Sequence, residues 1–182
     1  MDSAREIRPN FWFYLSCLRP KYLIPDLEIG SLADLNCNHL QERRIQGVIL
    51  DVDNTITSYD GTTIDERVRE KVDEIKKGFK TCLMSNTDVV RMCQLERYFS
   101  IPVIQTRERK PLPQPFEQAL AYLETKSKET AIVGDRLLTD IAGAKRMGLY
   151  TIKVSPLKMF SEPFVHTLAR GLETAVLRFY QE

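Results

Sequence analysis

The chain has 182 residues, of which 43% are hydrophobic and 28% are charged, a composition typical of an ordinary soluble globular protein with one full core. A formal net charge of +1 provides no electrostatic argument for binding nucleic acid, which favours a stripe of basic side chains. The four cysteines are scattered, without a C-x-x-C pair or a histidine cluster, which argues against a zinc site and a disulfide framework and favours a reducing compartment.

The first feature along the chain is an aromatic segment, residues 11–25, with basic side chains on both sides. Two interpretations of it stay open. The aromatic rings could lie at headgroup depth in a membrane interface, with the basic groups toward anionic lipid, so that the protein binds the membrane peripherally. Alternatively, the segment is a helix that docks its aromatic side chains on the domain. No apolar run approaches the ~20 residues that span a bilayer.

A short polar helix is expected next, with Ser31 as its N-cap. We place a boundary after it, with the N-terminal segment and lead-in helix over 1–45 and the core over 46–182. Short apolar runs predict strands at 48–52, 81–84, 101–104, 130–133 and 150–154. Amphipathic runs predict helices at 65–77, 88–99, 116–126, 138–147 and 162–180, and prolines at 111, 113 and 115 break the chain before the third of these.

This alternation of strands and helices is typical of an α/β protein with a doubly wound parallel sheet and helices on both faces. Ligands of such sheets bind beyond the carboxyl ends of the strands. Polar residues that suit a site follow four predicted strands: Asp51, Asp53 and Thr55 after the first, Ser85 and Asn86 after the second, Arg107, Arg109 and Lys110 after the third, and Asp135, Thr139 and Asp140 after the fourth. The sequence therefore predicts one polar site at this edge of the sheet.

The residue types at this edge indicate metal-assisted phosphoryl transfer. Mg²⁺ prefers oxygen ligands and takes few protein carboxylates, which Asp51, Asp135 and Asp140 would supply together with a backbone carbonyl near Asp53. A hydroxyl group and a lysine would hold the phosphoryl oxygens and neutralise developing charge. Because the sequence offers no useful histidine or reactive-cysteine constellation, an aspartate is the natural nucleophile, and a neighbouring carboxylate could carry the proton.

These residues also stand in the order of a known set of motifs. The stretch DVDNT at 51–55 resembles the D-x-D-x-T signature of the haloacid dehalogenase (HAD) superfamily of phosphohydrolases. Ser85, Lys110 and the stretch GDRLLTD at 134–140 resemble its second, third and fourth motifs. The resemblance covers roughly residues 46–155, and it implies a Rossmann-like HAD fold, Mg²⁺ as cofactor and an aspartyl-phosphate intermediate.

The resemblance further implies a role for each matching residue. Asp51 would be the nucleophile and Asp53 the general acid/base. The residues that would bind the phosphoryl group or support its loop are Ser85, Asn86, Lys110 and Thr55. The residues that would hold the metal are Asp51, Asp53 through its main-chain carbonyl, Asp135 and Asp140. For Asp140, direct ligation and orientation of a metal-bound water both stay open.

The spacing of these motifs leaves no room for the cap domain that many HAD enzymes insert, because only about 30 residues separate Thr55 from Ser85. An open site suits a bulky substrate, or one that a membrane or macromolecule presents. The whole chain resembles the capless subclass IIIA group, which includes phosphatidylglycerophosphate (PGP) phosphatases. This resemblance implies dephosphorylation of PGP to phosphatidylglycerol, a cardiolipin precursor, at an anionic membrane surface.

Two other functions stay open at this point. The enzyme could hydrolyse a soluble phosphometabolite or a phosphoprotein. In a different class, the chain could be a receiver-like phosphoacceptor or a non-catalytic interaction module, although a receiver would not need Asp53 two places after Asp51 as an acid/base. We expect no nucleic-acid partner and no required protein partner. The expected compartment is the cytoplasm or an organelle matrix, mitochondrial or plastid in a eukaryote.

Overall fold

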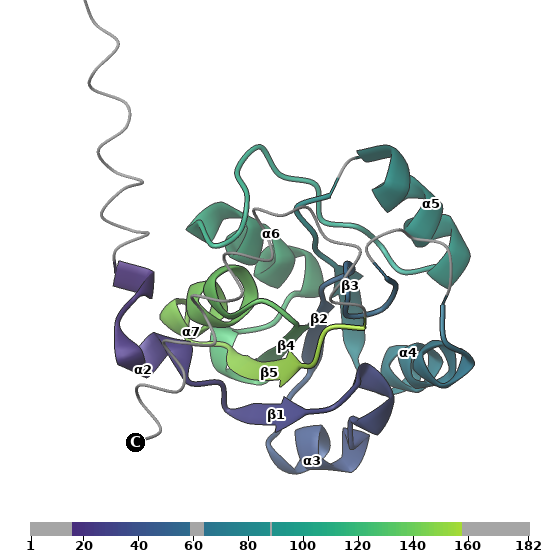
Figure 1. Cartoon of the computed structure of the whole chain (residues 1–182), viewed down its shortest axis with the longest axis horizontal. Coiled ribbons are helices and arrows are strands. Elements are labelled where there is room, and N and C mark those ends of the chain that lie inside the picture. Colours follow the sequence, from purple (N-terminus) through teal and green to yellow (C-terminus); the bar gives the residue numbers. More distant parts are fainter. Residues whose placement is uncertain (1–15, 59–63, 88, 158–182) are drawn as a thin grey trace, which may run out of the picture.

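The structure, a computed structural model, describes residues 16–58, 64–87 and 89–157. At its centre is a five-stranded sheet with the strand order β1-β5-β4-β2-β3 (Figure 1). All neighbouring strands are parallel. The strands are β1 Leu27–Ile29, β2 Gly47–Leu50, β3 Lys80–Leu83, β4 Thr130–Gly134 and β5 Tyr150–Val154. The predicted α/β fold with a parallel sheet is confirmed.

Helices cover both faces of the sheet, because side chains alternate between the two faces along each strand. On β2, Val48 and Leu50 join one apolar cluster and Ile49 joins another. The first cluster includes side chains of α3, α4 and α5, and the second includes side chains of α6 and α7. These helices are α3 Cys37–Glu42, α4 Glu66–Gly78, α5 Val89–Phe99, α6 Pro113–Leu123 and α7 Gly143–Arg146. The sheet is therefore doubly wound, as predicted.

Helix α4 shows how the sequence builds one of these covers. The carboxylate of Asp65 caps its first turn by accepting a hydrogen bond from the backbone N–H of Arg67 at 2.8 Å. Val68, Val72 and Ile75 form an apolar stripe, and all three are buried against the sheet. Each buried side chain of this kind contributes about 2 kcal/mol, so the stripe accounts for most of the attachment of α4. Between Asp53 and Ser85, the described residues form α4 and β3 and no cap domain.

The prediction of a full strand at 101–104 is wrong. Only Val103 forms a bridge with the sheet, opposite Leu83. Ser100 adopts the left-handed backbone conformation, with a φ of 51°, where α5 ends, and Pro102 has no N–H to donate to a ladder. The extended path beside β3 is therefore confined to a very short stretch.

Strand β1 is absent from the sequence prediction, because three residues with an exposed Glu28 at the centre are too few to show an alternating pattern. β1 nevertheless pairs with β5 along its whole length. Leu32, Leu35 and Leu40, which follow it, are buried in the same cluster as α4. The expected boundary after residue 45 therefore cuts through the sheet and its core, and the core begins no later than Leu27.

Helix α6 begins at Pro113, before the predicted start at residue 116. Pro113 and Pro115 lie in its first turn, where the N–H groups have no partner within the helix and a missing N–H costs little. The prolines therefore begin the helix instead of breaking the chain. Phe116 follows them and is fully buried in the second apolar cluster.

The described end of the aromatic segment packs on the core. Cys17 and Leu23, the latter in the short helix α2 Pro20–Leu23, are buried against three side chains of η3. η3 is a π-helical turn over Leu137–Ala142 that, with α7, replaces the regular helix predicted at 138–147. No helix within residues 16–58, 64–87 and 89–157 is long and apolar enough to cross a bilayer. Most aromatic residues of the segment, and the helix predicted at 162–180, lie outside the described residues.

The side chain of Asp26, the residue before β1, binds to β5. Its Oδ2 accepts hydrogen bonds from the backbone N–H of Thr151 at 2.9 Å and from the Thr151 hydroxyl at 2.8 Å, and its Oδ1 lies 3.1 Å from Nζ of Lys145. Burial raises the pKa of Asp26, but these contacts with Thr151 and Lys145 outweigh it, and the pKa is lowered overall. The ionised carboxylate therefore stabilises the native state.

We expect Asp26→Asn to lower the free energy of unfolding at pH 7 by about 0.5 kcal/mol, because two hydrogen bonds and an ion pair lose the charge of their acceptor while solvent screens this exposed carboxylate. The stabilisation is present above the ordinary pKa of 3.8 and is lost as the pH falls through the lowered value. In urea unfolding, the free energy of unfolding of the variant should therefore lie below that of the wild type at pH 7, and this deficit should be smaller at pH 3. Asp73→Asn, in a surface ion pair of α4, is the control. An equal deficit at both pH values would contradict this expectation.

Candidate active site

The ends of β2 and β4 bring two aspartates to one edge of the sheet. The two strands are neighbours, and the backbone N–H of Asp51 donates to the carbonyl of Val133 at 2.9 Å. Asp51 and Asp135 thus leave the sheet next to each other. The chain runs from β2 to β3 on one side and returns through β4 on the other, and ligands of parallel sheets bind at such a reversal of strand order.

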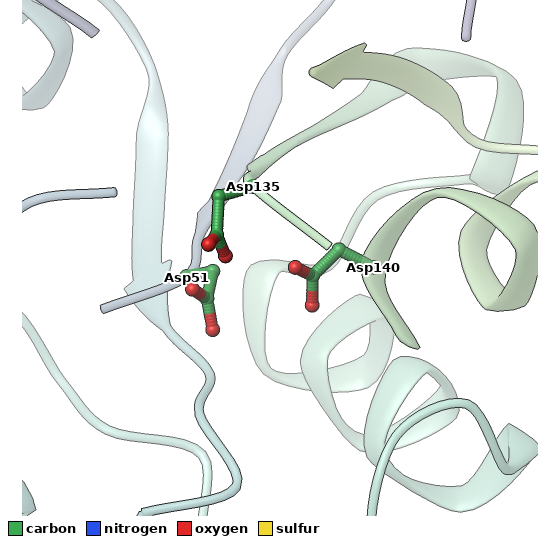
Figure 2. A group of neighbouring side chains, drawn as sticks. All are labelled: Asp51, Asp135 and Asp140. Atoms are coloured by element: carbon green, nitrogen blue, oxygen red, sulfur yellow. The ribbon is translucent and has the colours of Figure 1, made fainter. Parts of the chain in front are cut away.

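Asp140 reaches the same point from η3. One carboxylate oxygen from each of Asp51, Asp135 and Asp140 lies within 4.8 Å of the others, and all three residues are buried. Figure 2 shows the three carboxyl groups converging on a common space. Gly134 makes this approach possible, because a Cβ at that position would lie 2.6 Å from the carboxyl carbon of Asp140. We refer to these three aspartates as the acidic cluster.

Lys110 inserts its ammonium group into the acidic cluster. Its Nζ donates hydrogen bonds to Oδ1 of Asp51 and Oδ1 of Asp140, both at 2.6 Å, and to the carbonyl of Met84 at 3.0 Å. The side chain of Lys110 is 2% exposed. Burial by itself would lower the pKa of Lys110, but the carboxylates of Asp140 and Asp51 raise that pKa overall, so the ammonium group stays charged.

The acidic cluster fits a divalent cation. Burial raises the pKa of Asp51, and repulsion from Asp140 and Asp135 raises it further against the attraction of Lys110. The three buried carboxylates thus repel one another, and a divalent cation would relieve this repulsion. Carboxylate oxygens are hard donors of the kind that Mg²⁺ prefers. The donor set therefore agrees with the predicted magnesium site.

Asp53 has different partners from Asp51, although only one residue separates them. Its Oδ1 lies 3.0 Å from a guanidinium nitrogen of Arg91, and its Oδ2 accepts a hydrogen bond from the Ser85 hydroxyl at 3.4 Å. Burial raises the pKa of Asp53, and the positive charges of Arg91 and Lys110 oppose this shift without cancelling it. Two carboxylates in such different surroundings are suited to two different tasks.

Arg91 is a residue of this site that the sequence analysis missed. It lies on α5, and besides Asp53 it contacts the backbone carbonyl of Ser58 at 2.8 Å. It thereby links α5 to the loop that follows β2. Arg91 does not follow a predicted strand, and within an amphipathic helix an arginine is expected to face solvent, so the sequence does not single it out. Its place in the first turn of the helix that follows Ser85 is the feature that points to it.

Asn86 and Thr55 support other residues of the site. The side chain of Asn86 donates to the Lys110 carbonyl at 3.1 Å and accepts from the Lys110 N–H at 2.9 Å, which fixes the backbone at Lys110. The hydroxyl of Thr55 donates to Oδ2 of Asp51 at 3.2 Å, and Thr55 is 1% exposed. Thr55 therefore holds Asp51 from the protein side, which agrees with the supporting role expected for it in the loop.

A pocket of about 210 Å³ opens over these residues, and we refer to it as the catalytic pocket. It is small for a whole ligand, since small-molecule sites span roughly 300–1,000 Å³, and it suits a phosphoryl group with its nearest atoms. Two arginines join Lys110 in giving it positive charge. The catalytic pocket is lined by Asp51, Asp53, Ser85, Asn86, Thr87, Arg109, Lys110, Arg136 and Thr139.

The chain matches the mitochondrial PGP phosphatase family over residues 14–156. It belongs to this family. The probable phosphatase YqeG of Bacillus subtilis is 32% identical over 158 residues, which are 86% of this chain and 91% of that protein. Phosphatidylglycerophosphate phosphatase 1, chloroplastic/mitochondrial, of Arabidopsis thaliana is 28% identical over 168 residues, and the match covers 87% of this chain and 48% of the plant protein. The chain thus spans about half the length of the plant relative.

Solved structures show the same fold. A predicted HAD-like family hydrolase from Porphyromonas gingivalis superimposes with a TM-score of 0.53 at 14% identity, covering 71% of this chain and 98% of that one. Together with the family match, this confirms the predicted HAD-superfamily phosphatase. The chain is a phosphoric monoester hydrolase, which decides against the receiver-like and non-catalytic alternatives.

We expect Lys110→Met to lower the free energy of unfolding of the metal-free protein by about 3 kcal/mol or more, because it leaves buried carboxylates without their ammonium partner. Urea unfolding in EDTA measures this change. Lys128→Met, at an exposed lysine of the short turn η2 Ser127–Glu129, is the matched control and should change the free energy by about 0.5 kcal/mol or less. A Lys110 variant as stable as the control would show that the ammonium group does not hold the acidic cluster together.

Proposed function

We propose that the protein is a Mg²⁺-dependent phosphatase that forms an aspartyl-phosphate on Asp51 and converts phosphatidylglycerophosphate to phosphatidylglycerol. The observation that carries this proposal is the pairing of Asp51 and Asp53 at one small cationic pocket. Asp51 contacts Lys110 within the acidic cluster, while Asp53 contacts Arg91 and Ser85. The match to a family of PGP phosphatases supports PGP as the substrate.

In the first step, a carboxylate oxygen of Asp51 attacks phosphorus and the bond from phosphorus to the ester oxygen breaks. Asp53, whose pKa is raised by burial, gives its proton to the departing ester oxygen. In the second step, Asp53 takes a proton from water as that water attacks the phosphorus of phosphoaspartate. Inorganic phosphate leaves, and Asp51 and the protonated Asp53 are regenerated.

The residues around this pair position the phosphoryl group and balance its charge. The ammonium group of Lys110, fixed by Asn86 through its backbone, lies next to the attacking oxygen. The Ser85 hydroxyl and the Arg136 side chain line the same pocket and can contact the other phosphoryl oxygens. These groups are held before substrate binds, so little reorganisation is needed during the reaction.

Asp51, Asp135 and the main-chain carbonyl of Asp53 are the proposed ligands of Mg²⁺, which when bound supplies positive charge to the phosphoryl oxygens. Asp140 takes a supporting part in this proposal. Its Oδ2 accepts a hydrogen bond from the backbone N–H of Arg136 at 3.0 Å, and its Oδ1 accepts from Lys110. Through these contacts Asp140 orients Lys110, and in this proposal it also orients a metal-bound water.

The open site and the relatives support a lipid substrate. Among the described residues no cap domain covers the catalytic pocket, so a headgroup at a bilayer surface can reach it. The Arabidopsis relative is named for phosphatidylglycerophosphate. We propose that the protein acts at an anionic membrane surface, in phospholipid and cardiolipin synthesis, from the bacterial cytoplasm or an organelle matrix. The interfacial role of residues 11–25 is part of this proposal.

We expect Asp51→Asn to reduce phosphate release by roughly 10³-fold or more, because the amide cannot act as the nucleophile. Circular dichroism should show that the variant folds, since asparagine has nearly the same size. Asp73→Asn, which lies on α4 outside the site, should retain wild-type turnover. Unchanged hydrolysis by the Asp51 variant would overturn the nucleophile assignment.

We expect the wild-type protein to release phosphate from PGP in mixed micelles faster than from a panel of soluble phosphate monoesters and phosphopeptides. The reaction should stop in EDTA and resume when Mg²⁺ is added, because the acidic cluster needs a divalent cation. Phosphate release is measured with PGP, with the soluble panel, and with PGP in EDTA before and after Mg²⁺ is added. Efficient turnover of the soluble panel without turnover of PGP would replace the lipid by a soluble phosphometabolite or phosphoprotein.

A further inference from the structure

A second pocket of about 360 Å³ opens beside the catalytic pocket, and we refer to it as the side groove. The two pockets share Ser85, Asn86, Thr87 and Arg109 in their linings. The rest of the side groove comes from the start of α5 and from the chain between β3 and Lys110. A substrate whose phosphoryl group lies in the catalytic pocket can therefore continue directly into the side groove.

The rim of the side groove carries positive charge that the catalytic steps do not use. Arg107 and Arg109 both line it, and both are exposed. Glu108 is the acidic residue among its lining, so the two arginines leave the groove with a net positive charge. Arg109 also lines the catalytic pocket, and the positive charge thus extends from one pocket into the other. This arrangement suits a ligand with a second anionic group near the scissile phosphate.

The lining of the side groove also has an apolar part. Met92 and Ile104 are buried in the lining of the side groove, and Val89 is 59% exposed at its edge. Val90, the next residue of α5, is 70% exposed. Two neighbouring exposed valines beside a charged groove provide a surface for a ligand that is apolar beyond its anionic group.

We propose that the side groove is the leaving-group subsite, which binds the phosphodiester of the substrate through Arg107 and Arg109 and the adjoining apolar part at Val89. This inference rests on the proposed function, because PGP carries a phosphodiester one glycerol unit away from its terminal phosphate and two acyl chains beyond that. With the terminal phosphate at Asp51, the phosphodiester reaches the neighbouring groove. The site therefore selects phosphate monoesters that carry a second, diester anion.

The test compares two soluble substrates that differ in the second anion. Glycerophosphoglycerophosphate, the deacylated headgroup, has the phosphodiester, and glycerol 3-phosphate lacks it. We expect Arg107→Gln to raise the KM for the deacylated headgroup about tenfold with little change in kcat, and to change the kinetics of glycerol 3-phosphate much less. Arg67→Gln, an exposed arginine of α4, is the matched control and should change neither substrate. Equal effects of Arg107→Gln on both substrates, or none on the headgroup, would overturn the subsite.

A second variant separates the lipid from its free headgroup. Val89→Ser should lower kcat/KM on PGP in micelles severalfold more than on the deacylated headgroup, because only the lipid has an apolar part to lose contact with. Equal losses on both would overturn the apolar half of the subsite.

If the proposed function is wrong, the wild-type protein will release no phosphate from PGP. Competition by the deacylated headgroup against hydrolysis of p-nitrophenyl phosphate would still measure the groove. A larger inhibition constant of the headgroup in Arg107→Gln than in the wild type supports the subsite, and an unchanged constant overturns it.

Discussion

The ammonium group of Lys110 is the contact on which the site depends. It joins a carboxylate from the end of β2 to a carboxylate from η3, and the two aspartates are far apart in sequence. Buried carboxylates so close to one another are costly, and a buried charge persists only when it is paired. The lysine makes the arrangement stable enough to fold while leaving an excess of negative charge in the acidic cluster. A divalent cation can bind to this excess of negative charge.

The scaffold around Lys110 is built to hold this arrangement rigidly. Asn86 fixes the lysine backbone through two hydrogen bonds. Gly143 lets α7 lie close to Phe116 and Pro111. A Cβ at position 143 would lie 2.8 Å from the ring of Phe116 and 3.0 Å from Cα of Pro111, the residue after Lys110. Cys17 and Leu23 pack against side chains of η3. These contacts hold the segments that carry Lys110 and Asp140, and preorganisation of this kind favours catalysis.

The two pockets divide the work of recognition. The catalytic pocket is small and polar, and its lining matches a phosphoryl group that many substrates share. The side groove is larger and combines arginines with apolar side chains, so it is where one phosphate monoester can be distinguished from another. In a protein without a cap domain among its described residues, selectivity of this kind has to come from the rim of the sheet. In the proposed reaction at a membrane surface, the bilayer would complete the enclosure of the substrate.

Local sequence patterns were enough to predict the alternation of strands and helices and the acids at Asp51, Asp53 and Asp135, because strand periodicity and loop position are local properties. The sequence also placed Ser85 after a strand, and it selected Lys110 although the run before it at 101–104 forms only one bridge with the sheet. The folded chain was needed to see that Arg91 meets Asp53, that Thr55 supports Asp51, and that β1 completes the sheet. These outcomes depend on contacts between segments distant in sequence, and a helix-surface arginine or a three-residue strand carries no periodic pattern that reveals its partner.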